Sequence, residues 1–209
     1  MTRKFLTDVY GSGGNDGDSE EVRQFYDAWA ASYDNEITEN GYASPKRCAE
    51  ALARFANNHD APVLDFGCGT GLSGLALKMA GFTTIDGVDL SADMLEGARG
   101  KKLYRSLRQI EAGENPITSP GDYAAVTLIG VIGIGAAPMS VFDTALDGLA
   151  PGGLIVLSLN DKVVLMDPSY EAALATRVAE GTARMLFREN GPHLPGVNVN
   201  STVYVLEKT

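Results

Sequence analysis

The sequence predicts an α/β protein built on a mostly parallel sheet, with a ligand crevice at the carboxyl ends of its strands. From Pro62 onward, short apolar runs alternate with segments of helical spacing, as in strands joined by right-handed helical crossovers. The first run, Val63–Phe66, breaks into the glycine turn Gly67–Gly71, and a second run closes on Asp89. A strand that turns sharply into a helix presents backbone amides to a ligand, and the crevice of such sheets lies at that edge.

The chain is expected to divide into a lead and one domain. Residues 1–18 are predicted to be flexible, because Tyr10–Asp18 is too polar and glycine-rich to order itself. Residues 19–209 are predicted to form a single domain, with a helical lid over 19–60 and the core over 61–209.

Two helices are expected in the lid. Apolar residues recur at three- and four-residue spacing from Val22 to Tyr33, which predicts one amphipathic helix. A second helix is expected to begin at Ser44-Pro45, with the serine as N-cap and the proline in the first turn, and to end at Asn57–Asp60.

The glycine turn and Asp89 together predict an adenosine-containing ligand, because their spacing places an acid opposite the hydroxyls of a ribose. Read literally, Gly69–Gly74 is also G-x-G-x-x-G, the dinucleotide pattern, which keeps an NAD(P)-dependent oxidoreductase as an alternative. The register differs, however, since Gly67 already ends the strand and Asp65 lies inside it. A carboxylate in that position repels a pyrophosphate and suits a ligand amine.

With an acid before G-x-G-x-G, this segment resembles the first motif of class I S-adenosylmethionine-dependent methyltransferases, and the resemblance extends from Val63 to about Lys208. The later landmarks follow in order: Gly87–Ser91, the third-strand end Gln109–Ala112, the fourth strand Asp122–Val131, the turn Pro151–Gly153, and a hairpin of Arg184–Arg188 and Thr202–Leu206. The resemblance implies a Rossmann-like, seven-stranded, mostly parallel sheet in the order 3-2-1-4-5-7-6, with an antiparallel last strand and flanking helices. It also implies S-adenosylmethionine as cofactor and S-adenosylhomocysteine as product.

The resemblance assigns cofactor contacts as well. Asp65 would face the ammonium of the ligand, the alternative being a structural carboxylate that bonds loop amides. Glu111 would bond the adenine amino group, with Glu114 as the alternative. The cofactor-binding residues that it implies are Asp65, Gly67, Cys68, Gly69, Gly71, Asp89, Leu90, Met94, Glu111, Ala112 and Gly130.

Aromatic residues of the first helix are candidates for the acceptor side. The segment Tyr26–Asp34 resembles the tyrosine-aspartate lid of small-molecule methyltransferases, although a stripe at this spacing also packs a helix onto a core. Tyr33 is a candidate catalytic residue. The candidate substrate contacts are Tyr26, Trp29, Val131 in the apolar wall after the fourth strand, and Tyr170 in a helix predicted over Asp167–Glu180.

His193 is a candidate catalytic base. It lies between the last two predicted strands, whose connecting loop would return to the ligand side of the sheet. Imidazole titrates near neutral pH, which suits a base. The alternative is a histidine of a surface loop.

Composition narrows the partners. The net charge is −10 with only 17 Lys and Arg, so the chain lacks the cationic surface that nucleic acid or an anionic membrane requires. The longest apolar run, Tyr123–Pro138, is shorter than the roughly 20 residues that span a bilayer and is expected to form a buried strand. A small-molecule substrate is therefore predicted, without nucleic acid or membrane partners.

Cysteine and histidine usage bear on location and metals. Cys48 and Cys68 are isolated thiols that suit a reducing compartment, and no secretory signal is evident, so a cytoplasmic location is expected. Two distant histidines predict no metal centre. Nothing indicates the oligomeric state.

The predicted function is transfer of a methyl group by in-line displacement to an unidentified small-molecule acceptor, uncharged or partly apolar. Two alternatives remain at this point. One is the NAD(P)-dependent oxidoreductase, and the other is a non-catalytic S-adenosylmethionine-binding protein that keeps the crevice without the chemistry.

Overall fold

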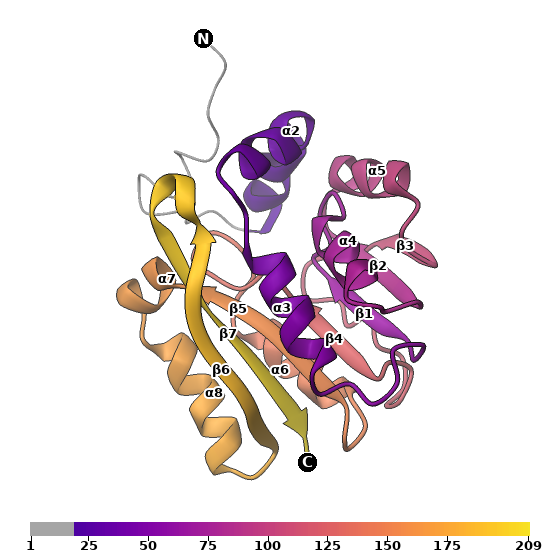
Figure 1. The fold of residues 1–209 in the computed structure, drawn as a ribbon, viewed down its shortest axis with the longest axis vertical. Coiled ribbons are helices and arrows are strands. Elements are labelled where there is room, and N and C mark those ends of the chain that lie inside the picture. The colour runs from indigo at the N-terminus through magenta and orange to yellow at the C-terminus, as the bar shows by residue number, and fades with distance from the viewer. Residues whose placement is uncertain (1–18) are drawn as a thin grey trace.

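The computed structural model describes residues 19–209, and the lead predicted over residues 1–18 lies outside them. A seven-stranded sheet in the order β3-β2-β1-β4-β5-β7-β6 forms the centre (Figure 1). β7 is antiparallel to both of its neighbours, while β1 pairs in parallel with β2 and β4. The predicted strand order and the antiparallel last strand are confirmed. The strands are β1 Val63–Phe66, β2 Ile85–Asp89, β3 Ser106–Gln109, β4 Ala125–Leu128, β5 Leu154–Asn160, β6 Ala183–Leu194 and β7 Val199–Lys208.

Helices cover both faces of the sheet. Leu52 of α3 and Leu77 of α4 belong to one buried cluster, and Leu146 of α6 and Leu174 of α8 belong to another. Burial on both faces explains why the central strands are continuous apolar runs. Figure 1 shows α2 outside these layers, over one end of the molecule. The helices are α2 Ser19–Glu39, α3 Ser44–Ala53, α4 Leu72–Met79, α5 Ala92–Lys101, α6 Ser140–Gly148, α7 Asp161–Met166, α8 Ser169–Ala179 and the 3₁₀ helix η1 Pro195–Val197.

The turn from β1 into α4 requires glycine. Gly67 has φ +70°, and a Cβ there would lie 2.5 Å from Cγ2 of Val131. Gly71 has φ +93° and is the N-cap of α4, a left-handed conformation that other residues adopt only with strain. The sharp strand-to-helix turn predicted from the glycine spacing is therefore present.

Two predicted helix boundaries need correction. Ala43, not Ser44, is the N-cap of α3, although proline does occupy the first turn. The Ser44 hydroxyl instead contacts Nδ1 of His193 at 2.7 Å and Oγ of Ser201 at 2.9 Å. The helix also ends at Ala53, before the predicted end at Asn57–Asp60.

The apolar run Tyr123–Pro138 forms a shorter strand than predicted. β4 covers only Ala125–Leu128, because Gly130 and Gly135 adopt positive φ values of +69° and +70°. Beyond β4 the chain folds back on itself, with an isolated bridge between Ile132 and Ala137. The run therefore supplies both a buried strand and a loop at its carboxyl end.

The final hairpin is longer than predicted, and this moves His193. The segment expected to be a loop continues as β6 to Leu194, and only η1 separates it from β7. The pairing register shifts between Pro192 and Leu194, which makes His193 the extra residue of a β-bulge. His193 is 3% exposed, and its carbonyl accepts a hydrogen bond from the amide of Ala43 at 2.9 Å.

Among residues 19–209, no helix combines the length and the apolar character needed to cross a membrane.

We expect His193 to make stability depend on pH. Burial, with a smaller contribution from the charge of Arg47, lowers its pKa from 6.5 to about 4. Between these values the unfolded chain binds a proton that the native protein does not, so the free energy of unfolding falls as the pH falls through this range. The free energy of unfolding should fall between pH 7 and pH 4.5 by roughly 2 kcal/mol more in the wild type than in His193→Asn. Urea unfolding at both pH values measures it, and an equal pH dependence in the two proteins would contradict the burial of a neutral imidazole.

Candidate functional site

A cavity of about 300 Å³ lies where β1, β2 and β4 end, and α2 borders it. Each strand contributes its last residues or the first residues beyond it, as expected for a parallel sheet. Of the residues predicted to bind cofactor or substrate or to act in catalysis, those that line the cavity are Gly67, Cys68, Gly69, Asp89, Leu90, Met94, Glu111, Ala112, Gly130, Tyr26, Tyr33 and Val131.

Asp89 joins two elements of the cavity wall. Its Oδ2 accepts the amide of Gly69 at 2.8 Å, and its Oδ1 accepts the amide of Ser91 at 2.9 Å. Burial raises the pKa of this carboxyl group, while the two amides act in the opposite direction. A carboxylate offers about four lone-pair positions, so Asp89, which lines the cavity, can accept further hydrogen bonds.

The loop beside Asp89 leaves room for a ligand. Gly69 has φ +52°, and a Cβ at this position would meet no other atom within 4 Å. Cys68 lies next to it with a buried thiol, and burial raises the pKa of that thiol well above its usual range. The backbone, rather than a nucleophilic side chain, therefore forms this part of the wall.

Asp65 lies outside the cavity lining, contrary to the expected contact with the ligand amine. Its carboxylate is 1% exposed and accepts hydrogen bonds from three hydroxyls: Ser73 at 2.6 Å, Tyr104 at 2.7 Å and Thr127 at 2.7 Å. Burial raises its pKa, and the hydroxyls partly offset this effect. Asp65 thus ties β1 to β4, to α4 and to the segment before β3, which is closer to the structural alternative, with hydroxyls in place of loop amides.

The loop after β3 forms another part of the cavity wall. Ile110, Glu111 and Ala112 line it together with Glu114. The Glu114 carboxylate pairs with Arg108, which lowers its pKa, and accepts the amide of Glu111 at 3.0 Å. The Glu114 carboxylate thus stabilises the conformation of this loop.

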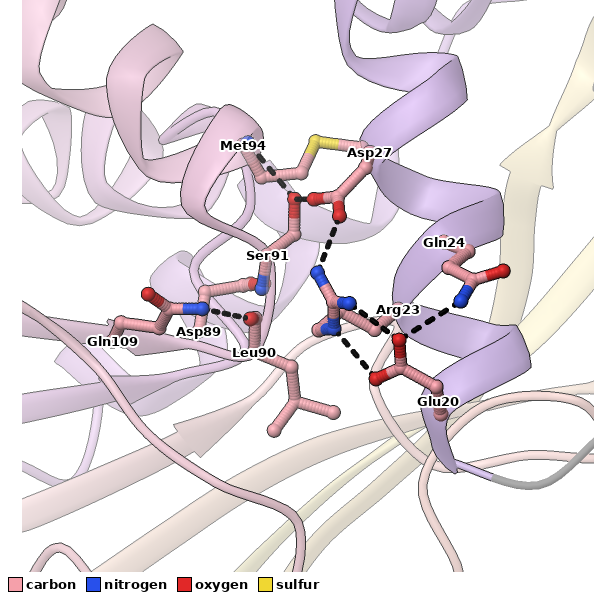
Figure 2. Close-up of polar contacts among 9 residues, drawn as sticks. All are labelled: Glu20, Arg23, Gln24, Asp27, Asp89, Leu90, Ser91, Met94 and Gln109. Carbon is pink, nitrogen blue, oxygen red and sulfur yellow. Dashed lines mark hydrogen bonds and ion pairs between the residues drawn. The ribbon is translucent and has the colours of Figure 1, made fainter.

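The helix α2 is fastened to the core by two aspartates. Asp27 accepts hydrogen bonds from the hydroxyl of Ser91 and from Nη1 of Arg23, the latter at 2.8 Å. Figure 2 shows Ser91 between Asp27 and the amide of Met94, which donates to the Ser91 hydroxyl at 3.0 Å. Through this bond Ser91 is the N-cap of α5.

Two turns further along α2, Asp34 accepts hydrogen bonds from Thr70 at 2.5 Å and from Lys101 at 2.6 Å. The two aspartates lie on one face of the helix and connect it to the glycine turn and to both ends of α5. Sequence reasoning missed this pair, although a seven-residue spacing of carboxylates is the signal that would have found it.

Four further predicted residues lie outside the cavity lining. Trp29 is 2% exposed and packs edge-on against Tyr33, with ring centroids 4.7 Å apart, and it belongs to a buried cluster with Leu194 and Val199. Tyr170 packs against the cluster beneath α6 and α8. Gly71 serves as the N-cap of α4. His193 is directed by its bulge toward Ser44 of α3 and does not overlook the cavity.

Other lining residues were not predicted. Arg23 contributes a guanidinium, and Tyr42 lies in the connection between α2 and α3. Pro45 borders Tyr42, and residues 136–138 with Ser140, Val141 and Thr144 close the side next to Val131. Only the packing of the helices brings these residues to one place. Within residues 19–209, no three His, Cys, Asp or Glu side chains are arranged to hold a metal ion.

The chain is similar in sequence to two methyltransferases. Methyltransferase-like protein 27 of Homo sapiens is 36% identical over 137 residues, which cover 64% of this chain and 56% of that protein. A trans-aconitate 2-methyltransferase of Rhizobium etli is 28% identical over 167 residues, covering 78% of this chain and 61% of that protein. The chain therefore spans 56% to 61% of the length of these two relatives.

Solved structures share the fold at low identity. The magnesium protoporphyrin IX methyltransferase of Synechocystis with bound SAH has a TM-score of 0.69 at 14% identity, covering 92% of this chain and all of that one. The [4+2]-cyclase SpnF has a TM-score of 0.67 at 16% identity, covering 91% and 96%. The family model described as a methyltransferase domain matches residues 41–195, most of the chain, and the chain therefore belongs to the methyltransferase domain family.

Proposed function

We propose that the chain is an S-adenosylmethionine-dependent methyltransferase that acts on a small-molecule acceptor. The observation that carries the proposal is the Asp89 carboxylate, which faces the cavity from the end of β2 and is held by the amides of Gly69 and Ser91. An acid at this position suits the two hydroxyls of a ribose. Membership of the methyltransferase domain family supports the same ligand.

The cavity fits an extended adenosyl ligand. With the ribose at Asp89, the adenine would lie toward Ile110–Ala112, beside the apolar side chain of Leu90. The amino-acid half would lie toward Gly67–Gly69 and the N-terminus of α4, where the positive end of the helix dipole favours a carboxylate. The open space beside Gly69 supports this fit.

When bound, the cofactor supplies a sulfonium-activated methyl group. The protein then has to align the acceptor with that group and exclude water. Tyr26 and Tyr33 of α2 border the cavity, and burial raises the pKa of Tyr26 to about 12, so its phenol stays neutral at physiological pH. We retain Tyr33 as a candidate catalytic residue on the acceptor side of the cavity. Chemistry of this kind requires no metal and no strong base.

The charge of the lining favours a neutral acceptor. Among the described lining residues Arg23 is the one cation, and its guanidinium is engaged by Glu20 and Asp27. Asp89, Glu111 and Glu114 add negative charge to the same cavity. A carboxylate-rich acceptor, such as the trans-aconitate named for the bacterial relatives, would be desolvated here without a free partner. We therefore propose an uncharged, partly apolar acceptor.

The two alternatives are separated by binding and turnover. An oxidoreductase would bind a nicotinamide cofactor, whose pyrophosphate would lie at the glycine turn and the N-terminus of α4. A non-catalytic protein would bind S-adenosylmethionine without methyl transfer. The similarity to a [4+2]-cyclase is a likeness of fold alone and favours neither. A cytoplasmic location remains a proposal that rests on the two isolated cysteines.

The first prediction concerns the cofactor. Isothermal titration with S-adenosylhomocysteine should give binding that Asp89→Asn weakens by about tenfold or more, roughly 1.4 kcal/mol, because the variant loses the charge opposite the ribose hydroxyls. Asp86→Asn is the matched control, since Asp86 lies on the same strand and bonds Arg105 and Ser106 outside the cavity. Unchanged affinity in Asp89→Asn, or binding of NADH alone, would contradict the proposal.

The second prediction concerns acceptor charge. Transfer of a labelled methyl group from S-adenosylmethionine should be detected with neutral, partly apolar alcohols, phenols or amides before it is detected with di- and tricarboxylates. Trans-aconitate at equal concentration should be methylated at least about tenfold more slowly, because each unpaired carboxylate loses hydration on entering the cavity. Preferential methylation of trans-aconitate would refute the neutral-acceptor assignment and leave the cofactor assignment intact.

A further inference from the structure

Tyr42 is placed at the cavity by the turn between α2 and α3. Gly41 adopts φ +73°, and the Tyr42 amide donates to the carbonyl of Ile37 at 3.2 Å. The next amide, that of Ala43, donates to the carbonyl of His193 at 2.9 Å, which fixes the turn against β6. Tyr42 is partly buried and lines the cavity.

The phenol of Tyr42 lies over the carboxyl end of β4. A Cβ added to Gly130 would collide with the Tyr42 hydroxyl oxygen, and a Cβ added to Gly67 would collide with Val131. Tyr42, Gly130, Val131 and Gly67 therefore form a contiguous row from the lid to the glycine turn. Glycine at position 130 is what allows the hydroxyl to approach the backbone this closely.

The proposed place of the ribose at Asp89 indicates which part of the ligand these four residues would contact. Ile110–Ala112 line the end proposed for adenine, and Asp89 lies at the place proposed for the ribose. The remaining length, bordered by Gly67–Gly69, Tyr42 and Pro45, is left for the amino-acid half and the group that reacts.

His193 forms the wall behind Tyr42. The two rings meet edge to face, with centroids 5.2 Å apart and an interplanar angle of 88°. Nδ1 of His193 is 2.7 Å from the Ser44 hydroxyl, which is 2.9 Å from the Ser201 hydroxyl. The charged neighbour of this group is Arg47, which donates to the Ser201 carbonyl at 3.0 Å. The imidazole is thus held from both sides and away from the cavity.

We propose that Tyr42 is the residue at which the acceptor meets the transferable methyl group, and that His193 acts through it as a positioning residue. This inference rests on the proposed function and adds to it a residue that contacts the acceptor. The Tyr42 hydroxyl is suited to exchange a hydrogen bond with a polar atom of a neutral acceptor, while the ring covers the site from the lid side. No proton transfer to His193 is involved.

The test compares S-adenosylmethionine with S-adenosylhomocysteine, which differ by the transferable methyl group. In protein labelled with ¹³C in its tyrosine rings, the Tyr42 signal, assigned by its loss in Tyr42→Phe, should take different positions in the two complexes. The Tyr123 signal should coincide in both, because the Tyr123 hydroxyl bonds Asp86 outside the cavity. Coincident Tyr42 signals in the two saturated complexes would overturn the inference.

Variants at His193 separate positioning from folding. His193→Phe keeps an aromatic edge against Tyr42, whereas His193→Asn keeps a polar partner for Ser44. The Tyr42 signal should still differ in position between the two complexes in His193→Phe, and this difference should disappear in His193→Asn. The dissociation constant for S-adenosylhomocysteine should change by no more than about twofold in either variant. The same response in both variants would overturn the positioning role.

A kinetic arm uses Tyr42→Phe, which keeps the ring and removes the hydroxyl. We expect kcat/KM for the acceptor found in the neutral panel to fall by about tenfold, as for the loss of one hydrogen bond to substrate, with cofactor affinity unchanged. Tyr123→Phe serves as the control, with no loss expected. Failure of either sulfur ligand to bind by calorimetry would overturn the proposed function itself, and this inference with it, whereas tight binding with coincident Tyr42 signals overturns the inference alone.

Discussion

The arrangement of the site depends on one carboxylate that holds two backbone amides. Asp89, at the end of β2, accepts the amide of Gly69 in the turn after β1 and the amide of Ser91 at the start of α5. A partly buried carboxylate loses hydration, and charge-assisted hydrogen bonds to amides compensate for that loss. The two bonds hold the glycine turn against the start of α5, and both segments line the cavity. The hydroxyl of Ser91 in turn donates a hydrogen bond to Asp27, which connects these segments to α2.

A second carboxylate, that of Asp65, is fully buried and does not line the cavity. Asp65 collects hydroxyls from Ser73, Thr127 and Tyr104, so that β1, β4, α4 and the segment before β3 meet at one point. Its raised pKa results from burial, and the three donors make that burial tolerable. The acid of the first motif therefore stabilises the wall behind the ligand position, while Asp89 faces the ligand position itself.

Local features of the sequence predicted the fold and several residues that line the cavity. The glycine spacing after Val63–Phe66 and the acid that closes the next strand are contained in short segments, and the structure places both as expected. The strand order followed from the resemblance of ordered motifs to a methyltransferase family. Features that depend on tertiary packing could not be predicted from the sequence in the same way. The β-bulge at His193 decides which way the imidazole points, and a single-residue shift in a strand reverses the face of a side chain.

The lid illustrates the same limit. The aromatic stripe of α2 predicted an amphipathic helix, but the sequence did not determine which aromatic side chains face the cavity. Tyr26 and Tyr33 line it, whereas Trp29 packs behind them. Tyr42 gave no periodic signal because it lies in a turn, and only the packing of α2 and α3 brings it over β4. Each residue along an α-helix is rotated by about 100° from the one before it. The aromatic stripe shows that one side of α2 is buried, but not which of its side chains face the cavity.

The central claim is that Asp89 binds the ribose of an adenosyl cofactor while it retains its two amides. A crystal structure of the protein with S-adenosylhomocysteine tests this most directly. The account predicts ribose hydroxyls within hydrogen-bonding distance of the Asp89 carboxylate, adenine beside Ile110–Ala112, and the sulfur atom on the Tyr42 side of the ribose. A ligand whose ribose lies elsewhere, or whose adenine occupies the Tyr42 end, would contradict it.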